Sequence, residues 1–178
     1  MHPRLTELLD YLDVTRASVL GAASTVPRDR WGVRPAPDRW SVAEICWHLQ
    51  RVESGVAKLI RKRTIEARAA GHPEESADSP LLGTRDRFGL ADRTRRLDAP
   101  ASVAPPEAPV AEDAQRLLEE SRALLRAAIA EADGLALGLI VHPHPVLGEI
   151  NLYDWILFVG LHEQRHLHQI GELAASTN

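Results

Sequence analysis

The sequence has little that would mark a secreted or membrane protein. Its one cysteine, Cys46, cannot form a disulfide within the chain, so a reducing cytoplasm is the expected compartment. The opening stretch MHPRLTELLDYLDV lacks the basic segment and the apolar run of a signal peptide. No run approaches the roughly 18 consecutive apolar residues of a membrane-spanning helix, so no membrane partner is expected.

Patterns of several common functions are missing too. The chain has no glycine-rich nucleotide-binding pattern, and no Ser-His-Asp arrangement can be read from it. Its net charge of −4 argues against a nucleic-acid partner, because the phosphate backbone favours a basic surface. We find no strand with convincing alternation and no internal repeat.

What the chain does have is an ordinary globular composition. It contains 178 residues, of which 44% are hydrophobic and 26% are charged. This length most simply forms one domain, residues 1–178, and can bury a core without disulfides or a structural metal. A metal ion bound by this chain is therefore expected to have a functional role rather than to be needed for folding.

Four segments have the apolar spacing of helices. They are residues 4–24, 41–70, 111–132 and 151–174. Ser41 and Glu44 form a capping-box pattern at the start of the second segment, and Trp40 before it is placed to pack back onto Ile45. Four long helices with one long crossover connection, residues 71–110, predict an all-α protein with the fold of a four-helix bundle.

The connections carry fewer signals. Residues 71–110 are rich in proline and alanine, and we expect a short helix or turn within TRDRFGLADRTRRL, residues 84–97. Aspartates are interleaved with the arginines of this stretch, which is typical of a solvated face rather than of a nucleic-acid site. Residues 141–150, VHPHPVLGEI, are expected to be a loop, with His142 and His144 either structural or at a pocket rim.

Two of the eight histidines lie one helical turn apart on the last predicted helix. With about 100° per residue, His166 falls about 40° from His162. Trp155, Val159 and Leu173 fall on the same side of the helix. The spacing therefore predicts that both histidines point into the core.

A third histidine, His48, lies on the second predicted helix, about 40° from Val52 at the edge of its apolar arc. It too should point into the bundle, whereas His168 falls off the apolar face and should be exposed. Burying three unpaired imidazoles is costly, and one Zn²⁺ or Ni²⁺ bound by His48, His162 and His166 would turn that cost into affinity. Three protein ligands leave a coordination position open, as in catalytic sites. The alternative is that each is an ordinary core histidine, hydrogen-bonded to a neighbour or to water.

The stretch HEQRH, which starts at His162, also matches the H-E-x-x-H signature of zinc proteases. The extended signature needs a glycine and a third histidine where this chain has Gln169 and Glu172. Residues 167–178 are expected on the same helix or its frayed end, so they offer no second helix to supply the third zinc ligand. A protease is therefore not favoured. Glu163 falls about 100° from His162, and is either a group that orients a ligand or, more readily, a surface charge.

Two stretches carry a family resemblance. RPAPDRWSVAEICWHLQRVE holds Trp40, Ser41 and His48 at the start of a helix. HPVLGEINLYDWILFVGLHEQRHLHQI, residues 144–170, joins a His-Pro-x-x-Gly loop to an H-x-x-x-H-x-x-Q-I ending. Together they cover about a quarter of the chain and resemble the DinB/YfiT superfamily.

The resemblance implies a four-helix bundle with a three-histidine site for one divalent metal ion, often nickel or zinc. The matching positions here are His48, His162 and His166. Members of the family include thiol transferases that use bacillithiol, mycothiol or glutathione, a mycothiol-dependent isomerase and metal-dependent hydrolases, and many are homodimers.

We therefore expect a metal-dependent enzyme that activates a bound low-molecular-weight thiol, or water, against a small-molecule substrate. Transfer of the thiol to small electrophiles is favoured, and hydrolysis is the alternative. Glu163 is a weak catalytic candidate, and Tyr153, Trp155 and Arg165 are expected at the pocket. Two further hypotheses stay open: a non-enzymatic metal- or ligand-binding stress-response bundle, and a metal-free bundle with packed histidines.

Overall fold

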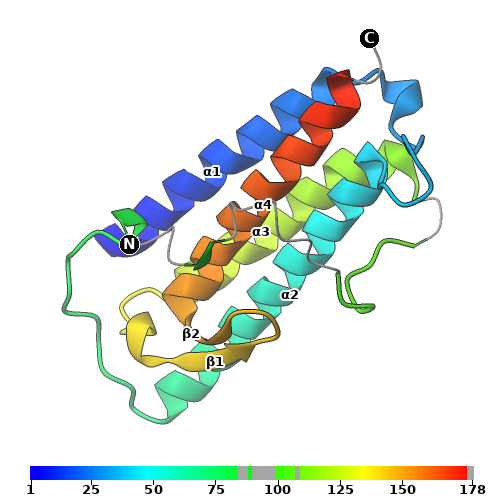
Figure 1. The fold of residues 1–178 in the computed structure, drawn as a ribbon. Helices are drawn as coiled ribbons and strands as arrows, with labels where there is room; N and C mark the ends of the chain where they lie inside the picture. Colours follow the sequence, from blue (N-terminus) through cyan, green and yellow to red (C-terminus); the bar gives the residue numbers. More distant parts are fainter. Residues whose placement is uncertain (84–87, 90–98, 107–108, 176–178) are drawn as a thin grey trace.

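In the computed structural model, four long helices run side by side as a bundle (Figure 1). The structure describes residues 1–83, 88–89, 99–106 and 109–175. In chain order the elements are α1 (Pro3–Ser24), the 3₁₀ helix η1 (Arg28–Arg30), α2 (Val42–Ala69), η3 (Ala111–Asp113), α3 (Ala114–Glu131), η4 (Leu137–Leu139), β1 (Val141–His144), β2 (Gly148–Asn151) and α4 (Leu152–Ala175). The predicted four-helix bundle is confirmed, and each long helix begins and ends within a few residues of its expected bounds. None of the described helices is both long and apolar enough to cross a membrane.

The direction of the helices explains why one connection is long. α1 packs mainly against α4, and α2 mainly against α3. The two helices of each pair run in the same direction (Figure 1). Between the end of α2 and the start of α3 the chain must therefore return along the length of the bundle. The short helix or turn expected within residues 84–97, with its arginines, lies outside the described residues except for Phe88 and Gly89.

Local signals fix the start of α2. Ser41 Oγ accepts a hydrogen bond from the Glu44 amide, and the Glu44 carboxylate accepts one from the Ser41 amide at 2.8 Å, so the predicted capping box is present. Trp40 packs against the apolar cluster that contains Ile45, as its position before the cap predicts. This start places His48 about two turns into the helix, on its buried side.

The expectation of a loop over residues 141–150 is wrong, because they lie in a two-stranded antiparallel hairpin. β1 pairs with β2, and His144 lies opposite Gly148. Pro143 is tolerated because β1 pairs with a single strand among the described residues, so the N–H that proline lacks is not needed to bond a second strand. Gly148 has φ 73°, a conformation that other residues rarely adopt. The strands are too short, and too rich in histidine and proline, to show alternation in the sequence.

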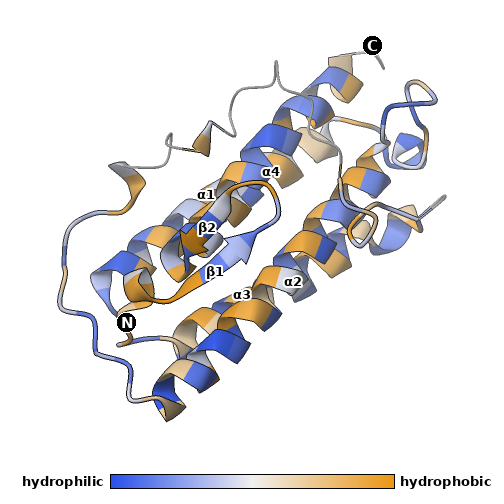
Figure 2. Ribbon diagram, turned by 60° about the horizontal axis from the view of Figure 1, so that its bottom comes forward, coloured by the Kyte–Doolittle hydropathy of each residue, from blue (hydrophilic) through white to orange (hydrophobic). Residues whose placement is uncertain are grey.

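Two apolar clusters fill the interior, one toward each end of the bundle. Each helix carries hydrophobic and hydrophilic stripes, as Figure 2 shows. A charged layer separates the clusters: along α1, for example, Arg16 lies between Leu12 of one cluster and Val19 of the other. This ion layer takes one buried residue from each helix, and its members are Arg16, Glu53, Arg122 and Glu163.

Candidate metal centre

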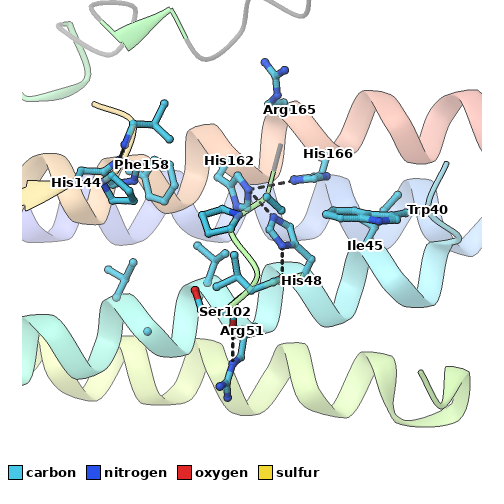
Figure 3. A pocket seen from close by; sticks show the side chains of 18 of the residues that line it. Trp40, Ile45, His48, Arg51, Ser102, His144, Phe158, His162, Arg165 and His166 are labelled. Atoms are coloured by element: carbon cyan, nitrogen blue, oxygen red, sulfur yellow. Dashed lines mark hydrogen bonds between the residues drawn. The ribbon is translucent and has the colours of Figure 1, made fainter. Parts of the chain in front are cut away.

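Three predicted ligands converge from two helices (Figure 3). His48 comes from α2, and His162 and His166 come from α4. His162 Nε2 lies 3.0 Å from His48 Nε2 and 3.1 Å from His166 Nε2. The three atoms all lie within 4.8 Å of one another. His48 is 4% exposed and His166 is 6% exposed, so both point into the bundle as predicted.

Two of the rings are held by oxygen atoms on their far side. His48 Nδ1 lies 2.7 Å from the carbonyl oxygen of Val103, and His166 Nδ1 lies 2.6 Å from Gln169 Oε1. A carbonyl oxygen only accepts, so Nδ1 of each neutral ring must carry the proton. Both rings therefore present the lone pair of Nε2 toward His162. Hydrogen bonds of this kind fix the orientation of metal-binding histidines in proteins.

The surroundings keep these imidazoles neutral. Burial lowers the pKa of His48, although the hydrogen bond to Val103 partly opposes the shift. Burial also lowers the pKa of His166 to about 3 and that of His162 well below its ordinary value, and the neighbouring histidines add to both shifts. A neutral imidazole is the form that binds a metal ion, so the site needs little proton release to become competent at neutral pH.

This donor set fits a divalent metal ion. Two nitrogens that each lie about 2.0–2.1 Å from a tetrahedral Zn²⁺ lie roughly 3.3 Å apart. The distances from His162 Nε2 to the Nε2 atoms of His48 and His166 are close to this value. The Nδ1 protons of His48 and His166 are already engaged, so at most one proton, on His162 Nε2, can lie between the three nitrogens. That proton satisfies the other two lone pairs only by being shared, whereas one metal ion accepts all three. Imidazole suits nickel and zinc alike, so the donor set does not choose between them.

Aromatic rings pack around the three imidazoles. Trp40 stacks on His166 with ring centroids 6.1 Å apart, and its ring is tilted against His48 at 4.9 Å. Phe158 stacks on His162 at 5.3 Å. These contacts restrict the orientations that the imidazole rings can adopt.

The histidines lie in the wall of a cleft of about 980 Å³ (Figure 3). On one side of them the cleft is apolar, with Val56, Leu59, Trp155 and Phe158 in its lining. On the other side it is charged, with residues that include Asp38, Arg39 and Glu172. An ion pair joins Arg39 to Glu172 at this charged end. The arrangement can receive a molecule with an apolar part and a polar part, each on one side of the histidines.

The expectation of a surface charge at Glu163 is wrong. Glu163 is 1% exposed, and it belongs to the ion layer rather than to the cleft. Its carboxylate accepts hydrogen bonds from Arg16 Nε at 2.6 Å, Arg122 Nη2 at 2.9 Å and Thr15 Oγ1 at 2.5 Å. Glu53 is bound by the same two arginines at 2.6–2.7 Å. Glu163 therefore cannot act as the water-activating base of an H-E-x-x-H protease in this arrangement.

The structure also places the other residues named from the sequence. Trp155 and Arg165 line the cleft as expected. Tyr153 does not, because its hydroxyl donates to Glu75 at 2.7 Å on the far side of the helix. His168 is exposed, as predicted, and Cys46 is buried.

Sequence reasoning missed the groups that hold the histidines. Gln169 lies three residues after His166, a spacing that brings two side chains together on a helix, so the sequence did contain a signal for this contact. Val103 contributes a backbone oxygen from an irregular segment, and no residue type marks such a contact. His144, which was expected to be either structural or at a pocket rim, is buried and lines the cleft.

Known proteins resemble this chain along most of its length. The model of the DinB superfamily matches residues 11–170. The uncharacterized protein YuaE of Bacillus subtilis (strain 168) is 29% identical over 141 residues, which are 79% of this chain and 80% of YuaE. The crystal structure of TT2238, a four-helix bundle protein, matches with a TM-score of 0.59 and 21% identity, over 93% of this chain and 95% of that chain. The last similarity is one of fold alone.

Proposed function

Because this chain belongs to the DinB superfamily, we propose that it is a divalent-metal-dependent enzyme that transfers a low-molecular-weight thiol to small electrophiles. His48, His162 and His166 hold one Ni²⁺ or Zn²⁺ ion. The observation that carries the proposal is the meeting of three Nε2 atoms, two of them with engaged Nδ1 protons, in the wall of a large cleft.

The ion and the protein contribute different parts of the chemistry. A bound divalent ion lowers the pKa of a thiol that coordinates it, so that the thiolate is available at neutral pH. Val103 and Gln169 keep the lone pairs of His48 and His166 turned inward. In the transfer, the sulfur forms a bond to the electrophilic carbon and the leaving group departs with the electrons of its own bond. The thiol proton passes to solvent.

The carboxylates of the cleft argue against hydrolysis that depends on a glutamate base beside the histidines. Among the described residues that line the cleft, the carboxylates are Asp38 and Glu172, and Glu172 is paired with Arg39. Glu163 is held in the ion layer. Hydrolysis of the H-E-x-x-H type therefore lacks its carboxylate base, whereas a metal-bound thiol with a lowered pKa is nucleophilic without one, as a metal-bound water can also be. A volume of about 980 Å³ is also at the upper end for ligand sites and can take two small molecules together.

The metal ligands are tested by metal analysis of untagged protein reconstituted with Ni²⁺ or Zn²⁺. We expect about one ion per chain in the wild type and in His168→Ala, which removes an exposed histidine of the same helix. His162→Ala should lose the ion. Less than about a tenth of an ion per wild-type chain, or full loading of His162→Ala, would refute the site.

The reaction is tested with monochlorobimane as the electrophile and glutathione, mycothiol and bacillithiol as thiols. We expect metal-dependent conjugation with one of them, lost in His162→Ala and kept in His168→Ala. Absence of turnover with every thiol contradicts the transferase assignment. Hydrolysis of simple esters by the same loaded protein would then support the hydrolase alternative.

A further inference from the structure

We propose that His144 is a fixed hydrogen-bond donor to the substrate, and that the apolar side of the cleft selects an electrophile with a carbonyl-type oxygen. This inference rests on the proposed function, because it assigns the substrate class of the same cleft. His144 is the histidine of the His-Pro-Val-Leu-Gly loop, at the end of β1.

The hairpin turn fixes the tautomer of His144. Its Nδ1 accepts hydrogen bonds from the backbone amides of Val146 at 3.1 Å and Leu147 at 3.2 Å. A nitrogen that accepts carries no proton, so the proton of the neutral ring must be on Nε2. The turn therefore leaves an N–H donor at the opposite edge of the ring.

This donor faces the cleft. No hydrogen bond to His144 Nε2 is formed within the described part of the chain. This nitrogen is also absent from the fully buried side-chain atoms that lack a partner, so it is accessible. The ring is 8% exposed and lines the cleft, so its remaining accessible surface lies there. A bound molecule would supply the hydrogen-bond acceptor that this N–H group lacks.

The neighbours of His144 make the donor rigid and keep it neutral. Its ring packs against Trp155 with centroids 4.7 Å apart and against Phe158 at 4.5 Å. Burial lowers the pKa of His144 to about 4, so the ring is uncharged at neutral pH. A neutral donor in apolar surroundings favours an uncharged acceptor such as a ketone, amide or ester oxygen, because it supplies no charge to balance a carboxylate.

The position of His144 suits a substrate that reaches the metal centre. Phe158 lies between the two sites, since its ring contacts His144 at 4.5 Å and stacks on His162 at 5.3 Å. An electrophile lying along this ring can place its oxygen at His144 and its reactive carbon toward the histidines. A site that offers a buried donor rejects analogues without an acceptor more strongly than an apolar wall does.

Two variants separate the donor from the structural role of His144. In His144→Asn, the side-chain oxygen can still accept from the turn amides, as asparagine does in turns, but the Nε2 donor is gone. In His144→Gln, an amide N–H can reach near the position of Nε2, but the turn loses its close acceptor. A donor role predicts that His144→Gln preserves more of the ligand binding than His144→Asn does, and a purely structural role predicts the reverse.

The probes are acetophenone and isopropenylbenzene, which has CH₂ in place of the carbonyl oxygen. Dissociation constants are measured by NMR titration of wild type, His144→Asn and His144→Gln, each in metal-free and zinc-loaded form. We expect His144→Asn to weaken acetophenone binding about five-fold or more and to change isopropenylbenzene binding by less than about two-fold. The dissociation constant of acetophenone for His144→Gln should lie between those for wild type and His144→Asn.

Three results would overturn the inference: equal weakening of both probes in His144→Asn, no weakening of either, or weaker acetophenone binding in His144→Gln than in His144→Asn. Each variant's urea midpoint shows whether the hairpin change has altered the fold. The binding readout does not need the metal. If His144→Asn does not selectively weaken acetophenone binding, the proposed enzyme function still stands. If it does so but no thiol shows metal-dependent turnover, only the proposed enzyme function is refuted.

Discussion

Replacing Glu163 by glutamine separates the two roles that the H-E-x-x-H spacing allows for this residue. A water-activating base can be replaced with little effect on stability and a large loss of chemistry. A member of the ion layer behaves differently, because the side chain is 1% exposed and accepts hydrogen bonds from two buried arginines. We therefore expect Glu163→Gln to destabilise the protein while leaving the three histidines in place.

The size of the effect follows from the charges of the layer. Arg16 and Arg122 are balanced by Glu53 and Glu163, and all four are at most 7% exposed. Removing one carboxylate leaves a buried positive charge, and breaking a buried ion pair in this way costs about 3–5 kcal/mol. Glutamine keeps the shape and one acceptor oxygen, so about 3 kcal/mol is expected. With a denaturant slope of about 2 kcal/mol/M, the urea midpoint should fall by roughly 1.5 M.

The assay is urea unfolding of the metal-free protein, followed by circular dichroism. Glu120→Gln is the matched control, because Glu120 lies on the exposed face of α3 and its loss should leave the midpoint nearly unchanged. Adding Arg16→Gln to Glu163→Gln restores the charge balance, since Arg122 and Glu53 remain paired. The double variant should therefore be more stable than the sum of the two single effects predicts, by about 1–3 kcal/mol.

Unfolding of Glu163→Gln at the wild-type urea midpoint would contradict a role for Glu163 in the ion layer. Loss of turnover at full metal content and full stability would show that Glu163 faces the metal in solution.

Three further predictions follow from the core and the buried titratable groups. Gly160→Ala should cost about 1–3 kcal/mol in urea unfolding, because a Cβ there would overlap the Tyr11 ring, whereas Gly171→Ala has open space and should be neutral or stabilising. Burial raises the pKa of Cys46 to about 12, so the folded protein should not react with a disulfide reagent at pH 8 and the unfolded protein should. Burial lowers the pKa of His166 from 6.5 to about 3, so below pH 6.5 the unfolded chain takes up a proton that the folded chain does not. Urea midpoints of metal-free protein should thus fall as pH drops from 6.5 toward 3, and His166→Ala should reduce this dependence.

The fold was accessible to sequence reasoning because its signals are local. Apolar spacing over 20 or so residues defines each helix, and the Ser41–Glu44 pattern defines the start of α2 to within one residue. The direction in which His48, His162 and His166 point also follows from helical geometry. What failed was the β1–β2 hairpin, whose two short strands depend on pairing with each other and on the turn at His144 rather than on alternation.

The details of the candidate metal centre depend on contacts between distant segments. His48 is held by the carbonyl oxygen of Val103, which lies 55 residues away, and any residue type supplies such an oxygen. Glu163 is buried because Arg16 and Arg122 arrive from two other helices. A helical wheel gives the angle of a side chain on its own helix, but not the charges that the other helices bring to it.

The placement of Glu163 also constrains what α4 can do. His162 and Glu163 are consecutive residues, so their side chains leave the helix about 100° apart. His162 faces the cleft, and Glu163 faces the arginines of α1 and α3. Turning α4 far enough to bring Glu163 to the cleft would carry both histidines away from His48 and would break the three hydrogen bonds that Glu163 accepts. Consecutive histidine and glutamate residues can serve one metal site in zinc proteases, so in this chain it is the ion layer that withholds Glu163 from the three histidines.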